Sequence, residues 1–130
     1  MFLDSSAIVE ILLDAPERGA LLSRLEAASG PFTTSATVIF ESSLVLSTRL
    51  KMEPQRAHRL VEDFLTAFSV DVLSITRDTA AVSVEAFSRY GKGRHPAKLN
   101  FGDCFSYAGA RQAGLPLLYV GEDFALTDLA

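Results

Sequence analysis

The chain opens with the stretch Met1-Phe2-Leu3-Asp4-Ser5-Ser6, in which an apolar run ends at an acid and two small hydroxyl residues. A short apolar run of this kind is typical of a buried strand. The serines are favoured at a helix N-terminus, where a hydroxyl accepts a hydrogen bond from a free backbone N–H group. The opening therefore predicts a strand that runs directly into a helix.

The rest of the chain repeats this alternation of short extended runs and longer helical patterns. Further strands are expected at 32–34, 70–75 and 116–120, where apolar and β-branched residues cluster. Between them the sequence predicts one helix that continues through Pro16 to near Gly30, and others at 35–50, 54–68, 78–90 and 102–113, a loop at 91–100 and a helical tail at 123–129. Strands separated by helices indicate an α/β fold with a short parallel β-sheet flanked by helices.

Two of these helices carry apolar stripes that predict their buried faces. Leu60, Phe64 and Phe68 recur at helical spacing in the expected helix 54–68. In the next helix Ala80, Val84 and Phe87 follow the same period. Both stripes are expected to face the core.

Composition restricts the class of protein. The chain has 130 residues, 48% of them hydrophobic and 22% charged, which fits a single domain over residues 1–130 and excludes a disordered tail. Its one cysteine excludes a disulfide framework and a multi-cysteine zinc site. No apolar run is long enough for a membrane span, and no basic residue precedes the first apolar run, so we expect a cytoplasmic protein without a signal peptide.

Charge is distributed unevenly along the chain. The net charge of −4 argues against a protein that binds nucleic acid through an overall positive charge. Nevertheless, no acid lies between Glu85 and Asp103, and that interval holds a cluster of basic residues: Arg89, Lys92, Arg94, His95 and Lys98. A charge run is most often a solvated loop, and the alternative is a contact surface for phosphates.

Several acids fall where a parallel α/β fold collects its ligands, beyond the carboxyl ends of the strands. Asp4 ends the first strand, where it could cap the next helix, although Ser5 and Ser6 already offer capping hydroxyls. Asp103 opens the helix after the basic loop, where a first-turn acid is favoured by the helix dipole. Asp123 and Asp128 follow the last strand, and each alone could be an exposed tail acid.

Glu41 is the most informative of the acids. On a helix it shares a face with Val38, Leu44 and Val45, and a carboxylate on an apolar stripe is costly unless it is paired or binds a metal. Clustered carboxylates favour Mg²⁺ or Mn²⁺, which suit the hydrolysis of phosphodiester bonds. The acids together thus predict a metal-assisted phosphodiesterase site, with the basic loop as a contact for phosphates.

The chain resembles the PIN-domain family, and within it the VapC toxins of toxin–antitoxin pairs. The motifs that carry the resemblance are Leu3-Asp4-Ser5-Ser6-Ala7, Glu41, the run Arg89–Pro96, Leu99-Asn100-Phe101-Gly102-Asp103-Cys104, Gly121-Glu122-Asp123-Phe124 and Thr127-Asp128. The likeness covers essentially the whole chain. It implies a PIN-like three-layer fold and a Mg²⁺-dependent endoribonuclease that cleaves RNA and is silenced by a VapB-type antitoxin.

The resemblance also implies roles for individual residues. Asp4, Glu41 and Asp103 match the family's acidic metal-binding positions, and Asp123 is our choice for the fourth acid, with Asp128 in reserve. Ser5 or Ser6 matches the hydroxyl beside the first acid, which orients that acid or a bound water. The substrate-binding set is therefore Ser5, Ser6, Lys92, Arg94 and Lys98, and the cofactor is Mg²⁺, with Mn²⁺ as an alternative.

Partners are predicted on the same basis. The resemblance implies a homodimer. An arginine of the antitoxin is expected to enter the acidic cluster, because a guanidinium can bridge two carboxylates. The antitoxin's apolar residues are expected to pack on helix surface near the amino terminus, with Ile11, Leu12, Leu22 and Leu25 as candidates.

Two other classes of protein compete with this interpretation. A catalytically silent PIN-like binding module would keep the fold without the activity. A Mg²⁺-binding phosphoacceptor receiver domain has a similar size, but it needs an acidic pair after the first strand and a lysine after the last. Asp4 has no acidic neighbour and no lysine follows Val120, so the receiver domain is the weaker alternative.

Overall fold

Four short parallel strands form a single sheet in the computed structural model, which describes residues 1–130. The order across the sheet is β3-β2-β1-β4. The strands are β1 (Phe2–Leu3), β2 (Thr33–Ser35), β3 (Asp71–Leu73) and β4 (Leu117–Leu118). Phe2 is paired with Thr33 on one side and with Leu117 on the other, so the first strand of the chain lies inside the sheet.

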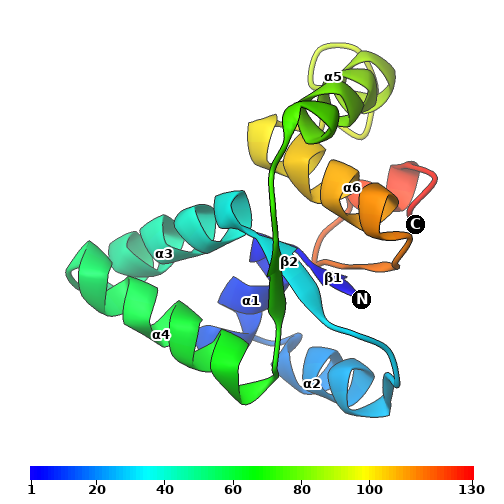
Figure 1. Ribbon diagram of the computed structural model, residues 1–130. Helices are drawn as coiled ribbons and strands as arrows, with labels where there is room; N and C mark the ends of the chain where they lie inside the picture. Colours follow the sequence, from blue (N-terminus) through cyan, green and yellow to red (C-terminus); the bar gives the residue numbers. More distant parts are fainter.

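Helices cover both faces of this sheet (Figure 1). One side holds α1 (Ser5–Leu12), α2 (Arg18–Ala27), α3 (Ala36–Leu50) and α4 (Pro54–Ala67), and the other holds α5 (Arg77–Tyr90) and α6 (Phe101–Ala113). A 3₁₀ turn, η1 (Phe124–Leu126), takes the place of the expected helical tail and lies beside α6. The three layers confirm the predicted α/β fold with a short parallel sheet.

The first helical segment is divided, contrary to the expectation of one helix reaching Gly30. Leu13 ends α1, and Asp14 adopts a left-handed backbone conformation with φ of 52°. Residues without glycine's freedom rarely take this conformation except where the chain must turn. The chain therefore reverses here, and α2 begins only at Arg18, two residues after Pro16.

The buried face of α5 also differs from the predicted one. Val84 is 70% exposed and Phe87 is 43% exposed, whereas the buried residues of the helix are Thr79, Ser83, Ala86 and Tyr90. Small side chains on this face let α5 pack closely against α6. Periodicity located the helix correctly, but the larger apolar residues lie on its outer side.

One apolar core joins the layers. Phe2, Leu3, Ile8, Leu25 and Leu46 are among its fully or almost fully buried members. In α4 the buried positions are Ala57, Val61, Phe64 and Leu65, while the predicted stripe residues Leu60 and Phe68 lie at the margin of the core. None of the helices has the length and apolarity needed to cross a bilayer.

Candidate active site

Asp4 lies where β1 ends and α1 begins, and its side chain is 3% exposed. Its Oδ2 accepts hydrogen bonds from the backbone N–H of Ser6 at 3.0 Å and from the Ser6 hydroxyl at 2.6 Å. Asp4 is thus the N-cap of α1, and the expectation that Ser5 and Ser6 would make this role redundant is wrong. The two serine hydroxyls do not cap the helix, because that of Ser5 donates to Glu41 and that of Ser6 donates to Asp4.

Ser6 also connects Asp4 to the far end of the chain. The backbone N–H of Val120 donates to the Ser6 hydroxyl at 3.0 Å. Because β1 and β4 are neighbours in the sheet, their carboxyl ends meet at this point. The strand order reverses between these two strands, which is where open α/β sheets form their ligand crevices.

Glu41 reaches the same region from the second turn of α3. Its Oε1 accepts a hydrogen bond from the Ser5 hydroxyl at 2.8 Å. The carboxylate lies against the backbone of Gly102 so closely that a Cβ at that position would overlap Oε2. The predicted stripe is only partly buried: Val38 is 2% exposed, but Leu44 is 44% exposed, so Glu41 stands at the edge of the core. A side chain at position 102 would therefore displace the Glu41 carboxylate from this place.

Asp103 is held in the first turn of α6 by a capping box. The Asn100 side chain accepts from the Asp103 backbone N–H at 2.9 Å, and Asp103 Oδ2 accepts from the Asn100 backbone N–H at 3.1 Å. The pKa of Asp103 is raised to about 6, mainly by burial and in addition by the charges of Asp4, Asp123 and Glu41, while the Asn100 hydrogen bond lowers it. The charges of the three other predicted acids therefore all reach Asp103.

Asp123 and Asp128 are separated in the structure. Asp123 is exposed and precedes η1, and its charge acts on Asp103. Asp128 instead accepts a hydrogen bond from the Tyr107 hydroxyl at 2.8 Å and pairs with Arg111 at 3.3 Å and Arg89 at 3.8 Å. The Tyr107 hydrogen bond and these two cations lower the pKa of Asp128 although burial opposes them.

Phe124 follows Asp123 and is docked in the core. It is 2% exposed, and its ring centroid lies 5.3 Å from that of Tyr119. The buried ring fixes the backbone next to Asp123 at the end of the last strand.

The basic loop is better ordered than its composition suggests. Ala97 and Leu99 are fully buried, and Leu99 exchanges backbone hydrogen bonds with Tyr90 and Lys92 across the base of the loop. The loop is therefore not wholly solvated, as a charge run most often is, because these two residues are buried. Its cations Lys92, Arg94 and Lys98 remain exposed and form no ion pair. None of the three is among the charges that shift the pKa of Asp103.

Sequence reasoning missed three residues of this region. Ser106 donates a hydrogen bond to Asp4, Asn100 caps the helix of Asp103, and Gly102 gives room to Glu41. The spacing of Asn100 and Asp103, three residues apart at a helix start, is a signal that could have indicated the capping box. Ser106 carries no such signal, since its acceptor lies 102 positions away.

The four acids form an acidic centre, defined here as Asp4, Glu41, Asp103 and Asp123. No three of its acids lie close enough to enclose a metal ion by themselves. Mg²⁺ does not require such a cage, because it is usually held by one or two carboxylates and keeps several waters. Asp4 and Asp103 are buried and have no basic partner, and the pKa of Asp103 is raised to about 6. Their carboxylate oxygens are the type of ligand that a hard divalent cation prefers.

Fold and site together define a three-layer α/β domain with an acidic centre at the carboxyl edge of its parallel sheet. The model of the PIN domain matches residues 1–129. The chain is 43% identical to a ribonuclease VapC of Mycolicibacterium smegmatis, covering 100% of this chain and 98% of the relative. It is 40% identical to a VapC ribonuclease of Rhizobium meliloti, covering 98% of each. The chain belongs to the PIN-domain family, and within it to the VapC proteins.

Solved structures with the same fold include two from toxin–antitoxin systems. The VapC20 toxin of Mycobacterium tuberculosis, described as cleaving the sarcin–ricin loop, superposes with a TM-score of 0.75 at 21% identity over 95% of this chain and 92% of that one. A toxin–antitoxin complex from Klebsiella pneumoniae gives a TM-score of 0.69 at 20% identity over 98% and 92%. At these identities the two structures support the fold.

Proposed function

We propose that this protein is a Mg²⁺-dependent endoribonuclease toxin of a type II toxin–antitoxin pair. The observation that carries the proposal is the acidic centre, in which two buried carboxylates without cationic partners lie within electrostatic reach of two further acids. Membership of the VapC group supports RNA as the substrate, because its relatives in this group are named ribonucleases.

The residues of the centre have separate tasks in this proposal. Asp4 and Asp103 would hold Mg²⁺. Glu41 and Asp123 would act through the waters of this ion or on a second ion. Mn²⁺ could take the place of Mg²⁺. When bound, the ion supplies an activated water and stabilises the charge on the leaving oxygen. Ser6 orients Asp4 and Ser5 orients Glu41, so that the acids keep their direction while the substrate binds.

The exposed cations of the basic loop supply the phosphate contacts. Lys92, Arg94 and Lys98 have no acidic partner, so each is free to pair with a phosphate of the RNA. The loop ends at Asn100, the N-cap of the helix that carries Asp103. The loop and the acidic centre are therefore continuous in the chain, so one RNA strand could contact both.

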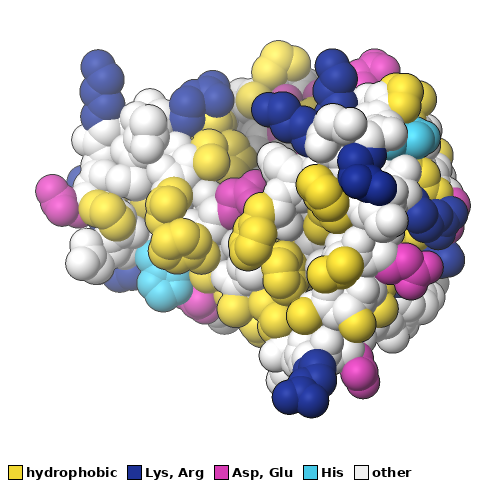
Figure 2. Space-filling view, turned by 90° about the horizontal axis from the view of Figure 1, so that it is seen from above, with side chains coloured by type: hydrophobic (Ala, Val, Ile, Leu, Met, Phe, Trp, Pro, Cys, Tyr) yellow, Lys and Arg dark blue, Asp and Glu magenta, His cyan; other side chains and the backbone are white.

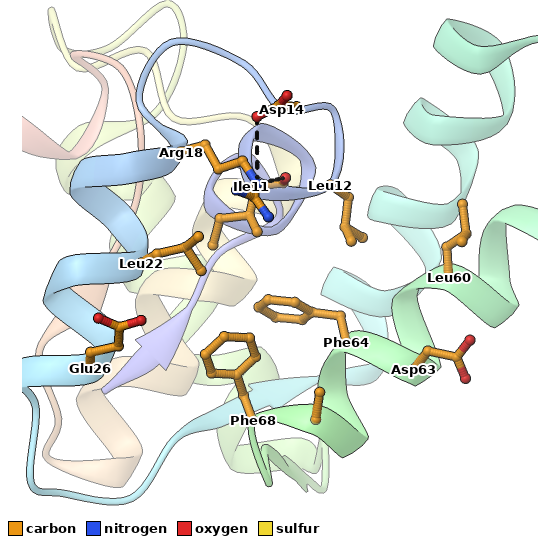
Figure 3. A pocket seen from close by; sticks show the side chains of 11 residues that line it. Ile11, Leu12, Asp14, Arg18, Leu22, Glu26, Leu60, Asp63, Phe64 and Phe68 are labelled. Carbon is orange, nitrogen blue, oxygen red and sulfur yellow. Dashed lines mark hydrogen bonds and ion pairs between the residues drawn. The ribbon is translucent and has the colours of Figure 1, made fainter.

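A cognate VapB-type antitoxin is the proposed partner. The apolar helix surface near the amino terminus is only partly available to it, because Ile11 and Leu25 are buried in the core. Leu12 and Leu22 are partly exposed, however, and with Phe64 and Phe68 they line a groove of about 720 Å³ between α1, α2 and α4 (Figure 3). Glu26 and Asp63 stand at its rim, and Asp14 is paired with Arg18 at 3.7 Å.

This groove fits an antitoxin segment that carries apolar residues flanked by basic ones. A further arginine of the antitoxin would enter the acidic centre, where a guanidinium can bridge two carboxylates and exclude the metal. Inhibition would thus combine an apolar anchor with a cation that replaces Mg²⁺. Antitoxin binding and inhibition that survive charge reversal of the antitoxin's arginines would contradict this mechanism.

A homodimer is proposed through the exposed apolar face of α3 and α6. Phe40 is 65% exposed and Phe101 is 75% exposed, and with Leu44 they line a hollow of about 530 Å³ that also touches Glu41. Figure 2 shows hydrophobic side chains gathered across one face of the molecule, seen from above. Phe40→Glu should shift the protein to a monomer in analytical ultracentrifugation, whereas an unchanged dimer would place the interface elsewhere.

The experiment that tests the activity compares RNA cleavage by the wild type with Mg²⁺ and with EDTA, and by Asp4→Asn and Asp103→Asn. Each variant replaces a metal ligand with a neutral residue of the same shape, so cleavage should be abolished while the circular dichroism spectrum is unchanged. Activity of the wild type in EDTA, or of either variant, would contradict the proposal. A folded wild type that cleaves no RNA would favour the silent PIN-like binding module.

A further inference from the structure

Ser106 lies on α6, is 1% exposed, and donates a hydrogen bond from its Oγ to Asp4 Oδ1 at 2.6 Å. The two residues are 102 positions apart in the sequence. A hydroxyl that donates to a carboxylate at this distance makes a charge-assisted hydrogen bond, which is shorter and stronger than a neutral one.

Three other buried helix serines in the molecule behave differently, whereas Ser5 also donates to an acid of the centre, Glu41. Ser43 donates to the carbonyl of Ile39 at 2.7 Å and Ser83 to the carbonyl of Thr79 at 2.8 Å, each within its own helix. The hydroxyl of Ser42 is buried without a partner. A helix serine can bond to the carbonyl four residues before it. The Ser106 hydroxyl instead leaves its helix and reaches Asp4.

The contact completes the hydrogen bonding of Asp4. Its Oδ2 is held by the amide and hydroxyl of Ser6, on the element that follows β1. Those bonds alone leave Oδ1 free to swing as the carboxylate rotates. Ser106 fixes Oδ1 from the opposite side of the sheet, so the plane of the carboxylate is set by two elements.

Ser106 is one helical turn after Asp103 on the same helix. Residues three apart on a helix share a face, so the helix that places Asp103 also places the donor to Asp4. The relative direction of the two buried acids is therefore controlled by α6.

We infer that Ser106 is a positioning residue of the acidic centre, which holds the Asp4 carboxylate in the direction needed to share a divalent cation with Asp103. The inference rests on the proposed function, because it assigns Ser106 a role in metal binding. Groups that orient a metal ligand by hydrogen bonding commonly change metal affinity by about 10–100-fold when they are removed.

The test compares Ser106→Ala with Ser42→Ala, which removes a buried helix hydroxyl that has no partner. Mn²⁺ binding to the full chain is measured by calorimetry, RNA cleavage by kcat and KM, and folding by thermal melting in EDTA. Ser106→Ala should bind Mn²⁺ about 10–100-fold more weakly and lose kcat in proportion, with KM for RNA little changed. Ser42→Ala should match the wild type in Mn²⁺ affinity and kcat.

Two further variants separate positioning from a purely structural role. Ser106→Thr retains the hydroxyl and should recover most of the Mn²⁺ affinity. If Ser106→Ala does not fold, Ser106→Cys, which keeps the side-chain size and donates only weakly, takes its place with the same readouts.

The outcomes distinguish this inference from the proposed function. A wild type that binds Mn²⁺, together with a Ser106→Ala variant equal to Ser42→Ala, would overturn the inference alone. A wild type that neither binds Mn²⁺ nor cleaves RNA would overturn the proposed function, and the inference with it.

Discussion

At the scale of single residues, the two buried acids of the centre are in contrasting surroundings. Asp4 accepts hydrogen bonds on both carboxylate oxygens from Ser6 and Ser106. Asp103 has the Asn100 amide as its one donor and is surrounded by other acids, so its pKa is raised to about 6. Hydrogen bonds therefore hold both oxygens of Asp4, whereas the charged form of Asp103 is costly and would be stabilised by a cation beside it.

The raised pKa of Asp103 predicts a pH dependence of stability. The folded protein binds this proton more tightly than the unfolded chain does, so stability is lost as the pH rises from about 4 through 6. The change from 3.8 to about 6 corresponds to about 3 kcal/mol. Urea unfolding in EDTA should therefore show the wild type losing stability relative to Asp103→Asn between pH 4.5 and pH 7.5.

Mg²⁺ provides the control for that measurement. A cation beside Asp103 lowers the cost of its charge, so saturating Mg²⁺ should restore much of the wild type's stability at pH 7.5 and leave Asp103→Asn almost unaffected. A constant difference between wild type and variant across this pH range would contradict the proposed environment of Asp103.

The choice between Asp123 and Asp128 is also made at the residue scale. Asp123→Asn should weaken the binding of a second Mg²⁺ and reduce the cleavage rate, because its charge acts on Asp103. Asp128→Asn should leave the rate almost unchanged but cost about 1 kcal/mol of stability, because it weakens the contacts to Tyr107, Arg89 and Arg111. A Mg²⁺ titration of the cleavage rate and a melting curve for each variant check this ranking; the reverse ranking would move the fourth acid to Asp128.

At the scale of elements, different residues of the basic loop hold its conformation and are proposed to bind RNA. Its conformation is held by buried Ala97 and Leu99 and by backbone hydrogen bonds at its base. The cationic side chains contribute little to that conformation, apart from one hydrogen bond from Arg94 to the carbonyl of Ser88 at 3.2 Å.

Replacing Lys92, Arg94 and Lys98 together by Ala should therefore leave the melting temperature nearly unchanged. RNA binding should weaken, and the slope of log affinity against log salt should become shallower by about 0.7 for each phosphate that no longer pairs with a cation. Fluorescence anisotropy with single-stranded RNA at several salt concentrations measures this slope. An unfolded variant, or a slope equal to that of the wild type, would show that the cations do not serve RNA binding.

Helices α3 and α6 show how neighbouring elements share the site. Gly102 has no side chain, so Glu41 of α3 can lie against the first turn of α6, next to Asp103. Adding a Cβ at Gly102 would displace the Glu41 carboxylate. The helical spacing of Glu41 with Val38 indicated that it points inward, but it did not indicate which residue it meets.

At the scale of the whole molecule, the groove between α1, α2 and α4 shares no lining residue with the acidic centre. An antitoxin that occupies both must therefore extend across the surface from one to the other. Such an arrangement allows binding and inhibition to be separated by mutation.

Leu22→Glu should weaken antitoxin binding by at least tenfold, because it places a charge on the apolar floor of the groove. Ser23→Glu adds the same charge at an exposed neighbouring position and should bind like the wild type. Co-expression with the product of the neighbouring gene, followed by measurement of the dissociation constant by surface plasmon resonance, compares them. Equal affinity of the two variants would place the antitoxin on another surface.

Local patterns in the chain were enough to predict the alternation of strands and helices and to select the candidate acids of the site. These features depend on local periodicity, helix capping and residue chemistry, which are readable over a few positions. Asp4, Asp103 and Glu41 could be selected because each is an acid at a strand end, a helix start or an apolar stripe.

Which side chains meet became clear only from the packing of distant segments. Ser106 reaches Asp4 across 102 positions, Ile11 and Leu25 are buried rather than offered to a partner, and Val84 faces solvent. Several faces of a helix can satisfy the same apolar period, and the choice among them depends on the helix that packs against it. Contacts between distant segments are set by the order of strands and the packing of layers, which no local pattern in the chain encodes.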